Sequence, residues 1–166
     1  MLEMSMVPPN LLGHAWKKSE HLIGKLKRVS HGRFEGHDIL HEMYSGKQQM
    51  WCIWEGDKED FPIIGVVITE VLQYPQKKLL CIQYCTGERL NEWKSDILDL
   101  LDRWAKECEC DGLELTGRKG WVRELKPDGW NEEYVILTKY FDGPETHIAF
   151  DRPQLELVDG LEVANG

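Results

Sequence analysis

The side chains best suited to metal chemistry in this chain form two short pairs, one of histidines and one of cysteines. His37 and His41 lie four residues apart with Glu42 beside them, so a helix would present both imidazoles on one face. Helical zinc sites use this spacing, but no third ligand is apparent and the sequence is not His-Glu-x-x-His. Cys108 and Cys110 are separated by one residue, closer than zinc-binding cysteines usually lie. We therefore predict surface histidines, packing cysteines and no metal site.

Motifs for nucleophilic or nucleotide-dependent catalysis are absent from the sequence. It contains no Gly-x-Ser-x-Gly elbow, no Walker loop and no dinucleotide fingerprint after a first strand. The 5 cysteines are an odd number, several at core-like positions, which indicates reduced thiols rather than a disulfide framework.

Composition places further limits on the function. A chain of 166 residues with 42% hydrophobic content fits one globular domain, and no apolar run is long enough to span a membrane. The first residues lack the basic and apolar regions of a signal peptide, so we expect a cytoplasmic protein. The net charge of −9 argues against direct binding of nucleic acid, because phosphate neutralisation requires a basic surface.

The elements that would position any site are clearest between Lys78 and Phe141. Apolar runs and helical periodicity predict strand 79–85, helix 91–108, strand 113–116, helix 120–125 and strand 134–140. Asn91 is expected to cap the long helix, whose apolar stripe includes Trp93 and Trp104. A strand–helix–strand unit of this length predicts a parallel pair of strands.

The preceding residues add helices and an antiparallel meander. The sequence predicts helices 12–29 and 35–44, strand 50–54 and strand 62–71, which with strand 79–85 completes the meander. The fold class is therefore α+β with a mixed sheet. We expect a domain over residues 1–141 and a loosely attached acidic arm over 142–166. The basic stretch 16–33 and this arm would meet each other or a partner, or form two solvated surfaces.

The order of elements resembles the GCN5-related N-acetyltransferase (GNAT) fold, and the segment from Gly120 to Trp130 resembles that family's short helix ending in a Gly-aromatic step. Residues 12–141 more closely resemble GNAT-like proteins encoded among the virion genes of tailed bacteriophages. This resemblance rests on Trp51–Trp54, Cys85–Trp93 and Gly117–Trp121 with Leu125–Pro127.

The resemblance implies where acetyl-CoA would bind. Family enzymes hold the coenzyme's pyrophosphate in a glycine-rich loop after the fourth strand, at a helix N-terminus. The loop here retains one glycine, its Arg89 would reach a phosphate and its Glu88 would repel one. If acetyl-CoA binds, the residues that the resemblance assigns to it are Tyr84, Thr86, Gly87, Arg89 and Asn91.

The catalytic acid of the family is also missing. Many members protonate the leaving thiolate with a tyrosine, and the resemblance places Leu125 at that position, where a leucine has no proton to donate. Glu70 would be the base of an active enzyme, although it is also an ordinary strand-end carboxylate. We therefore expect no cofactor and a protein that has lost acetyl transfer. An N-acyltransferase that uses acetyl-CoA in an atypical loop is the alternative.

A protein of this kind would act through its surface. Arg118 and Lys119, with Trp121 and Trp130 near loop ends, are the predicted contact residues, because aromatic side chains bury a large area at low entropic cost. The resemblance implies virion or assembly partners and a place in the host cytoplasm or the virion. A small regulator that binds a host protein is the third hypothesis.

Overall fold

The structure, a computed structural model, describes residues 1–25 and 30–142 and is built on one mixed sheet. The sheet has 5 strands in the order β1-β2-β3-β4-β5. The strands are β1 (Leu2–Met6), β2 (Gln48–Glu55), β3 (Ile63–Gln73), β4 (Lys78–Gly87) and β5 (Gly112–Leu115). Neighbouring strands from β1 to β4 are antiparallel, and β4 and β5 are parallel. The predicted meander and the predicted parallel pair are both present.

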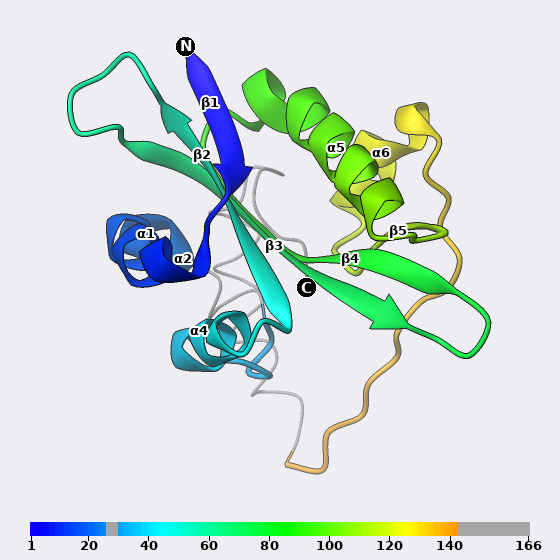
Figure 1. Ribbon diagram of the computed structural model, residues 1–166. Coiled ribbons are helices and arrows are strands. Elements are labelled where there is room, and N and C mark those ends of the chain that lie inside the picture. Colours follow the sequence, from blue (N-terminus) through cyan, green and yellow to red (C-terminus); the bar gives the residue numbers. More distant parts are fainter. Residues whose placement is uncertain (26–29, 143–166) are drawn as a thin grey trace.

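Helices cover both faces of the sheet (Figure 1). One face carries α1 (Leu12–Lys18), α2 (Glu20–Ile23) and α4 (Gly36–Tyr44). The other face carries α5 (Leu90–Glu107) and α6 (Gly120–Leu125). Short 3-10 turns, η1 (Pro9–Leu11) and η2 (Lys126–Asp128), precede α1 and follow α6. This is the mixed α+β architecture expected from the sequence.

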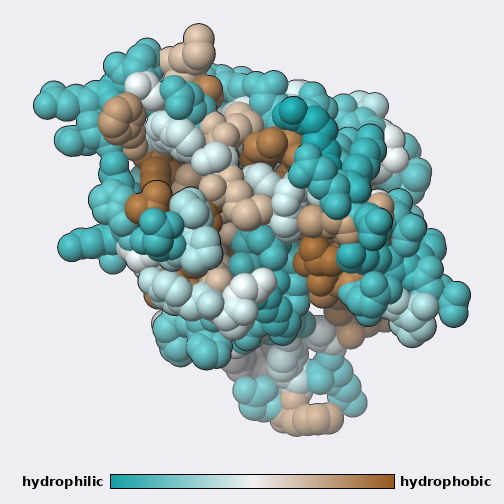
Figure 2. Space-filling model, viewed as in Figure 1, coloured by the Kyte–Doolittle hydropathy of each residue, from teal (hydrophilic) through white to brown (hydrophobic). Residues whose placement is uncertain are grey.

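The core lies on both faces of the central strands: α5 covers one face, and buried residues of α1, α2 and α4 pack on the other. The buried positions of α5 follow the spacing of one helical stripe, which the sequence predicted with small differences. They are Leu90, Trp93, Ile97, Leu101 and Ala105. Trp93 is fully buried, whereas Trp104 is only half-buried and packs edge-to-face on Trp51 of β2, with 5.4 Å between ring centroids. The surface facing the viewer in Figure 2 is mainly hydrophilic, with separate hydrophobic patches.

The N-terminal part differs from the prediction in two ways. Residues 2–6, for which no element was predicted, form β1 and pair with the edge of β2. The predicted helix 12–29 is divided at Ser19, whose hydroxyl donates a hydrogen bond of 2.7 Å to the carbonyl of Ala15. A serine that bonds back to the preceding turn competes with the regular helix, which accounts for the break. Residues 26–29 lie outside the described residues.

Two further predictions are wrong. The predicted strand 134–140 has no regular structure and is largely exposed, because strand propensity alone does not supply a pairing partner. Asn91 does not cap α5: the cap position is Arg89, with φ of 58°, and no side chain caps the helix. The predicted arm lies outside the described residues except for Asp142. Within the described residues, no helix is long and apolar enough to cross a membrane.

Candidate functional site

The turn from β4 to α5 is fastened to the neighbouring strand. Gly87 and Arg89 both have positive φ, and the N–H of Glu88 between them donates to the carbonyl of Ile64 on β3 at 2.8 Å. Glu88 in turn accepts a hydrogen bond of 2.8 Å on its carbonyl from the indole Nε1 of Trp93. The loop that the resemblance assigns to a coenzyme is therefore held by contacts within the chain.

Gly87 serves the packing of Trp93. A Cβ atom at this glycine would lie 2.5 Å from the carbonyl oxygen of Ile64 and 3.1 Å from the indole ring. A Cβ at Gly65, paired with Gly87 across β3 and β4, would lie 2.8 Å from the same ring. The two glycines leave room for the indole on the sheet, which explains the retained glycine without a bound phosphate.

Arg89 lies in a cluster of charges at the start of α5. Its guanidinium forms ion pairs with Glu55 of β2 at 2.7 Å and with Glu92 of α5 at 2.6 Å. Lys58 adds a second cation 2.9 Å from Glu55. The ion pair with Arg89 lowers the pKa of Glu92, and hydrogen bonds from Lys58 and then Arg89 lower the pKa of Glu55. Both carboxylates therefore remain charged at neutral pH, and Arg89 is already engaged.

Two of the other residues assigned to acetyl-CoA, Tyr84 and Thr86, point away from the start of α5. The side chains of Tyr84 and Thr86 lie on the sheet face opposite α5: Tyr84 packs edge-to-face on Phe34, and Thr86 donates a hydrogen bond to the carbonyl of Leu22. Asn91 is exposed in the first turn of α5. Of the 5 predicted residues, Gly87, Arg89 and Asn91 thus lie together at the start of α5. The side chains of the other two do not reach this position.

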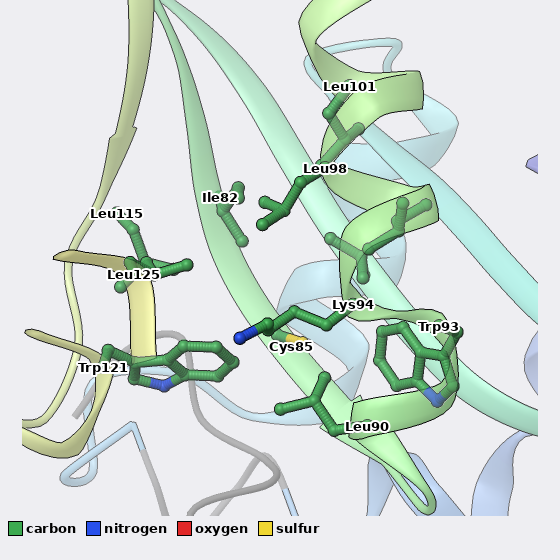
Figure 3. A pocket seen from close by; sticks show the side chains of 12 residues that line it. Ile82, Cys85, Leu90, Trp93, Lys94, Leu98, Leu101, Leu115, Trp121 and Leu125 are labelled. Carbon is green, nitrogen blue, oxygen red and sulfur yellow. The ribbon is translucent and has the colours of Figure 1, made fainter. Parts of the chain in front are cut away.

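An apolar cleft lies between β4, β5, α5 and α6 (Figure 3). Ile82 and Cys85 form its floor on β4, and the remaining lining comes from α5, β5, α6 and Val67 of β3. A β-bulge beside this part of β4, between Ile68 and Thr69 of β3, changes the register of the pair. Bulges of this kind are common next to functional sites. The cavity volume is only about 20 Å³, room for roughly one water molecule.

Side chains from α6 and α5 occupy the mouth of this cleft. Trp121 and Leu125 of α6 point toward β4, and the amine of Lys94 reaches across from α5 (Figure 3). Lys94 Nζ is 3.2 Å from the carbonyl of Glu124 and 3.3 Å from its carboxylate, so the two helices are joined across the cleft. Sequence reasoning missed Lys94 and Glu55. Their ion-pair partners, Glu124 and Arg89, lie in other helices or turns, and the local sequence pattern does not indicate such contacts.

Glu70 lies apart from the cleft. Its carboxylate accepts hydrogen bonds from the amides of Gln48 at 3.2 Å and Gln83 at 3.1 Å, and Lys47 lies 3.7 Å away. Glu70 pairs with Cys81 in the β3–β4 ladder and follows the Thr69–Ile82 pair, so its side chain is on the face opposite Ile82. A base at this position would not face the apolar cleft.

The predicted contact residues have different surroundings. Lys119 is exposed, Arg118 is half-buried, and Trp130 is half-buried and packs against the core. Trp121 is only 7% exposed and lines the cleft, so its prediction as an exposed anchor is wrong. Sequence reasoning did not predict the burial of Trp121, because only the tertiary structure shows that α6 turns this side chain inward.

No metal centre emerges from the described residues. They contain no cluster of three or more potential metal-binding side chains. His37 instead lies 3.5 Å from a carboxylate oxygen of Glu35 and 3.3 Å from one of Asp38. The cysteines, all within the described residues, are free thiols, and burial raises the pKa of Cys52 to about 12.

Comparison with known proteins identifies the fold. No protein-family model and no curated protein matches the sequence. Similar solved structures include an acetyltransferase from Clostridium acetobutylicum, described as predicted and crystallised with acetyl-CoA (15% identity, TM-score 0.58, 83% of this chain and 96% of that one). An aminoglycoside acetyltransferase from an uncultured soil metagenomic sample aligns with a TM-score of 0.62 at 12% identity, over 84% and 98% of the chains. The ribosomal-protein-alanine N-acetyltransferase of Brucella melitensis aligns at 13% identity and 0.57, over 83% and 100%.

The chain has a GNAT-like fold. Identities this low establish the architecture alone, and the substrates of these proteins are their own.

Proposed function

We propose that this chain is a GNAT-like protein that has lost acetyl transfer and acts through contacts with other proteins in the assembly of a tailed bacteriophage. We infer the loss of acetyl transfer from the charge cluster at the start of α5. A helix N-terminus attracts the pyrophosphate of a coenzyme when its N–H groups face an open loop. Here Arg89 is paired with two carboxylates of the chain, and Glu88 adds a third negative charge to the same turn. These residues do not fit a pyrophosphate.

The closed cleft supports the same proposal. A coenzyme arm needs a channel. The cleft between β4 and β5 has a cavity volume of only about 20 Å³, because Trp121 and Leu125 occupy it. Opening it would require separating α6 from α5, with loss of the Lys94–Glu124 contacts and exposure of apolar surface.

Binding of acetyl-CoA tests this part of the proposal. Titration calorimetry of the full chain with acetyl-CoA should give a dissociation constant weaker than about 1 mM, because the site presents negative charge to an anion. The matched variant Glu88→Gly with Glu92→Gln removes two of the carboxylates and should bind more tightly than the wild type. A dissociation constant in the low micromolar range for the wild type would refute the loss of the coenzyme site.

The alternative is an N-acyltransferase with an atypical coenzyme loop. Two observations favour it: the fold is shared with a protein crystallised with acetyl-CoA, and the β4–β5 cleft is apolar. Under this alternative, Glu70 would be the candidate base. The alternative would be supported if the wild type acetylates an amine and the Glu70→Gln variant, still folded, does not.

The assembly role rests on the resemblance to phage virion proteins and on the contact residues Arg118, Lys119 and Trp130. Mass spectrometry of purified particles should detect the chain, and particles made without it should lose infectivity. If particles never contain it and remain fully infectious without it, the assembly role is wrong. A regulator of a host protein would instead be recovered bound to that protein in infected cells.

A further inference from the structure

The loop that joins β2 to β3 holds two consecutive residues other than glycine in the left-handed region. Asp60 has a φ of 66° and Phe61 a φ of 46°. This conformation is uncommon outside glycine, and for a side chain as bulky as phenylalanine it is an outlier. Residues in strained conformations persist only where their surroundings fix them, and they gather at functional sites. The loop is therefore a candidate functional segment.

The first helices supply the contacts that fix this loop. The amine of Lys18, at the end of α1, donates hydrogen bonds to the backbone carbonyls of Asp60 and Phe61. A ring nitrogen of His21 in α2 lies 3.2 Å from the carbonyl of Ile63, where β3 begins. Figure 1 shows the loop projecting beyond the ends of β2 and β3. Its conformation is thus set by contacts with residues about 40 positions earlier in the chain.

The loop presents an aromatic ring and two carboxylates to solvent. Phe61 is 56% exposed. Glu59 and Asp60 are exposed, and no ion pair or hydrogen bond within residues 1–25 and 30–142 engages their carboxylates. The remaining loop carboxylate, that of Asp57, lies 2.6 Å from the amino group of Met1. An exposed aromatic side chain on a backbone fixed in advance is typical of a contact with another molecule, because little conformational entropy is lost on binding.

A basic helix face lies next to this acidic loop. His14, Lys17 and Lys18 are three and four residues apart in α1, so they share one face of the helix. Lys17 is exposed and, in the described part of the chain, has no carboxylate partner. Because Lys18 contacts the loop, the acidic and basic groups lie side by side. Such a surface is self-complementary: a two-fold axis between loop and helix places acid against base twice.

We propose that two copies of this chain form a two-fold symmetric dimer in which loop residues 59–61 of each copy contact the α1 face of the other. The ring of Phe61 packs on the apolar stem of Lys17 of the second copy, and Glu59 and Asp60 face its amine. A second copy is the partner that the surface itself specifies, because it matches both charges at once. The dimer does not depend on the loss of acetyl transfer, and α1 lies on the sheet face opposite α6.

Removal of the ring gives the first test, using the full chain and sedimentation equilibrium. The wild type should form a reversible dimer that weakens as salt is added, because the paired charges are exposed. Phe61→Asn should raise the dimer dissociation constant about tenfold or more. Leu137→Asn, which removes an apolar side chain that is 90% exposed elsewhere, is the matched control and should leave the dissociation constant unchanged.

The melting temperature of the monomer distinguishes a contact residue from a residue that supports the fold. Asparagine adopts the left-handed region more readily than phenylalanine. Phe61→Asn, measured at concentrations where the protein is monomeric, should therefore melt no lower than the wild type. A structural role for the ring would instead lower the melting temperature.

Charge complementation gives the second test. Glu59→Lys and Lys17→Glu should each dimerise about tenfold more weakly alone, because like charges then face each other at both symmetric contacts. Mixed together, they should form a heterodimer with about wild-type affinity, since both loops again face opposite charges. A mixture of Glu59→Lys with the wild type is the control and should recover only in part, because one of its two contacts remains repulsive.

Three results would overturn the proposal. A wild type that stays monomeric at all concentrations is the first. The second is a Phe61→Asn variant that dimerises as tightly as the wild type or that melts at a lower temperature as a monomer. The third is a mixture of the two charge variants that forms no more heterodimer than the control mixture.

Discussion

Replacing Trp93 with alanine should remove the main support of the turn between β4 and α5. The indole is fully buried, rests on Gly65 and Gly87, and donates a hydrogen bond to the carbonyl of Glu88. Truncation of a buried tryptophan costs about 3–5 kcal/mol in free energy of unfolding. Since about 1 kcal/mol shifts the melting temperature of a chain of this length by roughly 2–4 °C, we expect a decrease of about 6–20 °C.

Calorimetry of the wild type, Trp93→Ala and Trp93→Phe measures this effect and separates its causes. Phenylalanine retains most of the apolar contact but has no N–H for Glu88, so Trp93→Phe should melt between the other two proteins. Gly87→Ala should also be destabilised, because its Cβ would lie 2.5 Å from the carbonyl oxygen of Ile64. A Trp93→Ala protein that melts within about 2 °C of the wild type would refute the assignment of this indole as the support of the turn.

Other substitutions test the packing, the charge cluster and the thiols. Trp104→Ala should lower the free energy of unfolding by about 1–3 kcal/mol, less than Trp93→Ala. The reason is that Trp104 is half-buried, so its removal eliminates mainly the edge-to-face contact with Trp51. Thermal denaturation compares the two variants. Arg89→Gln should melt below the wild type at pH 7, and the difference should become smaller as the pH falls into the acid range. Its two carboxylate partners have lowered pKa values, so their contribution is present above the unfolded pKa near 4.3 and is lost as the pH falls through the folded pKa. In the native protein at pH 8, a thiol reagent should leave Cys52 unmodified, since burial raises its pKa to about 12, and should modify it after unfolding; mass spectrometry locates the label.

Patterns that repeat along the chain predicted much of the fold. The helix expected over 91–108 is α5 at Leu90–Glu107, the strand expected over 79–85 is β4 at Lys78–Gly87, and the short helix 120–125 has the bounds of α6. These elements were predictable because the spacing of apolar residues reflects which face of a helix or strand is buried. Strand 134–140 has the same composition but no pairing partner among the described residues, and composition carries no information about pairing.

The sequence by itself determined the class of fold, the position of the loop after β4 and the residues in that loop. Only the tertiary structure decided what those residues do. Arg89 is engaged because the end of β2 brings Glu55 to within 2.7 Å of it, although the two residues are 34 positions apart in the chain. Trp121 fills the cleft instead of forming an exposed anchor because α6 turns its side chain toward β4. Periodicity is a local property of the chain, whereas ion pairs and cleft closure arise from contacts between distant segments, which no local pattern encodes.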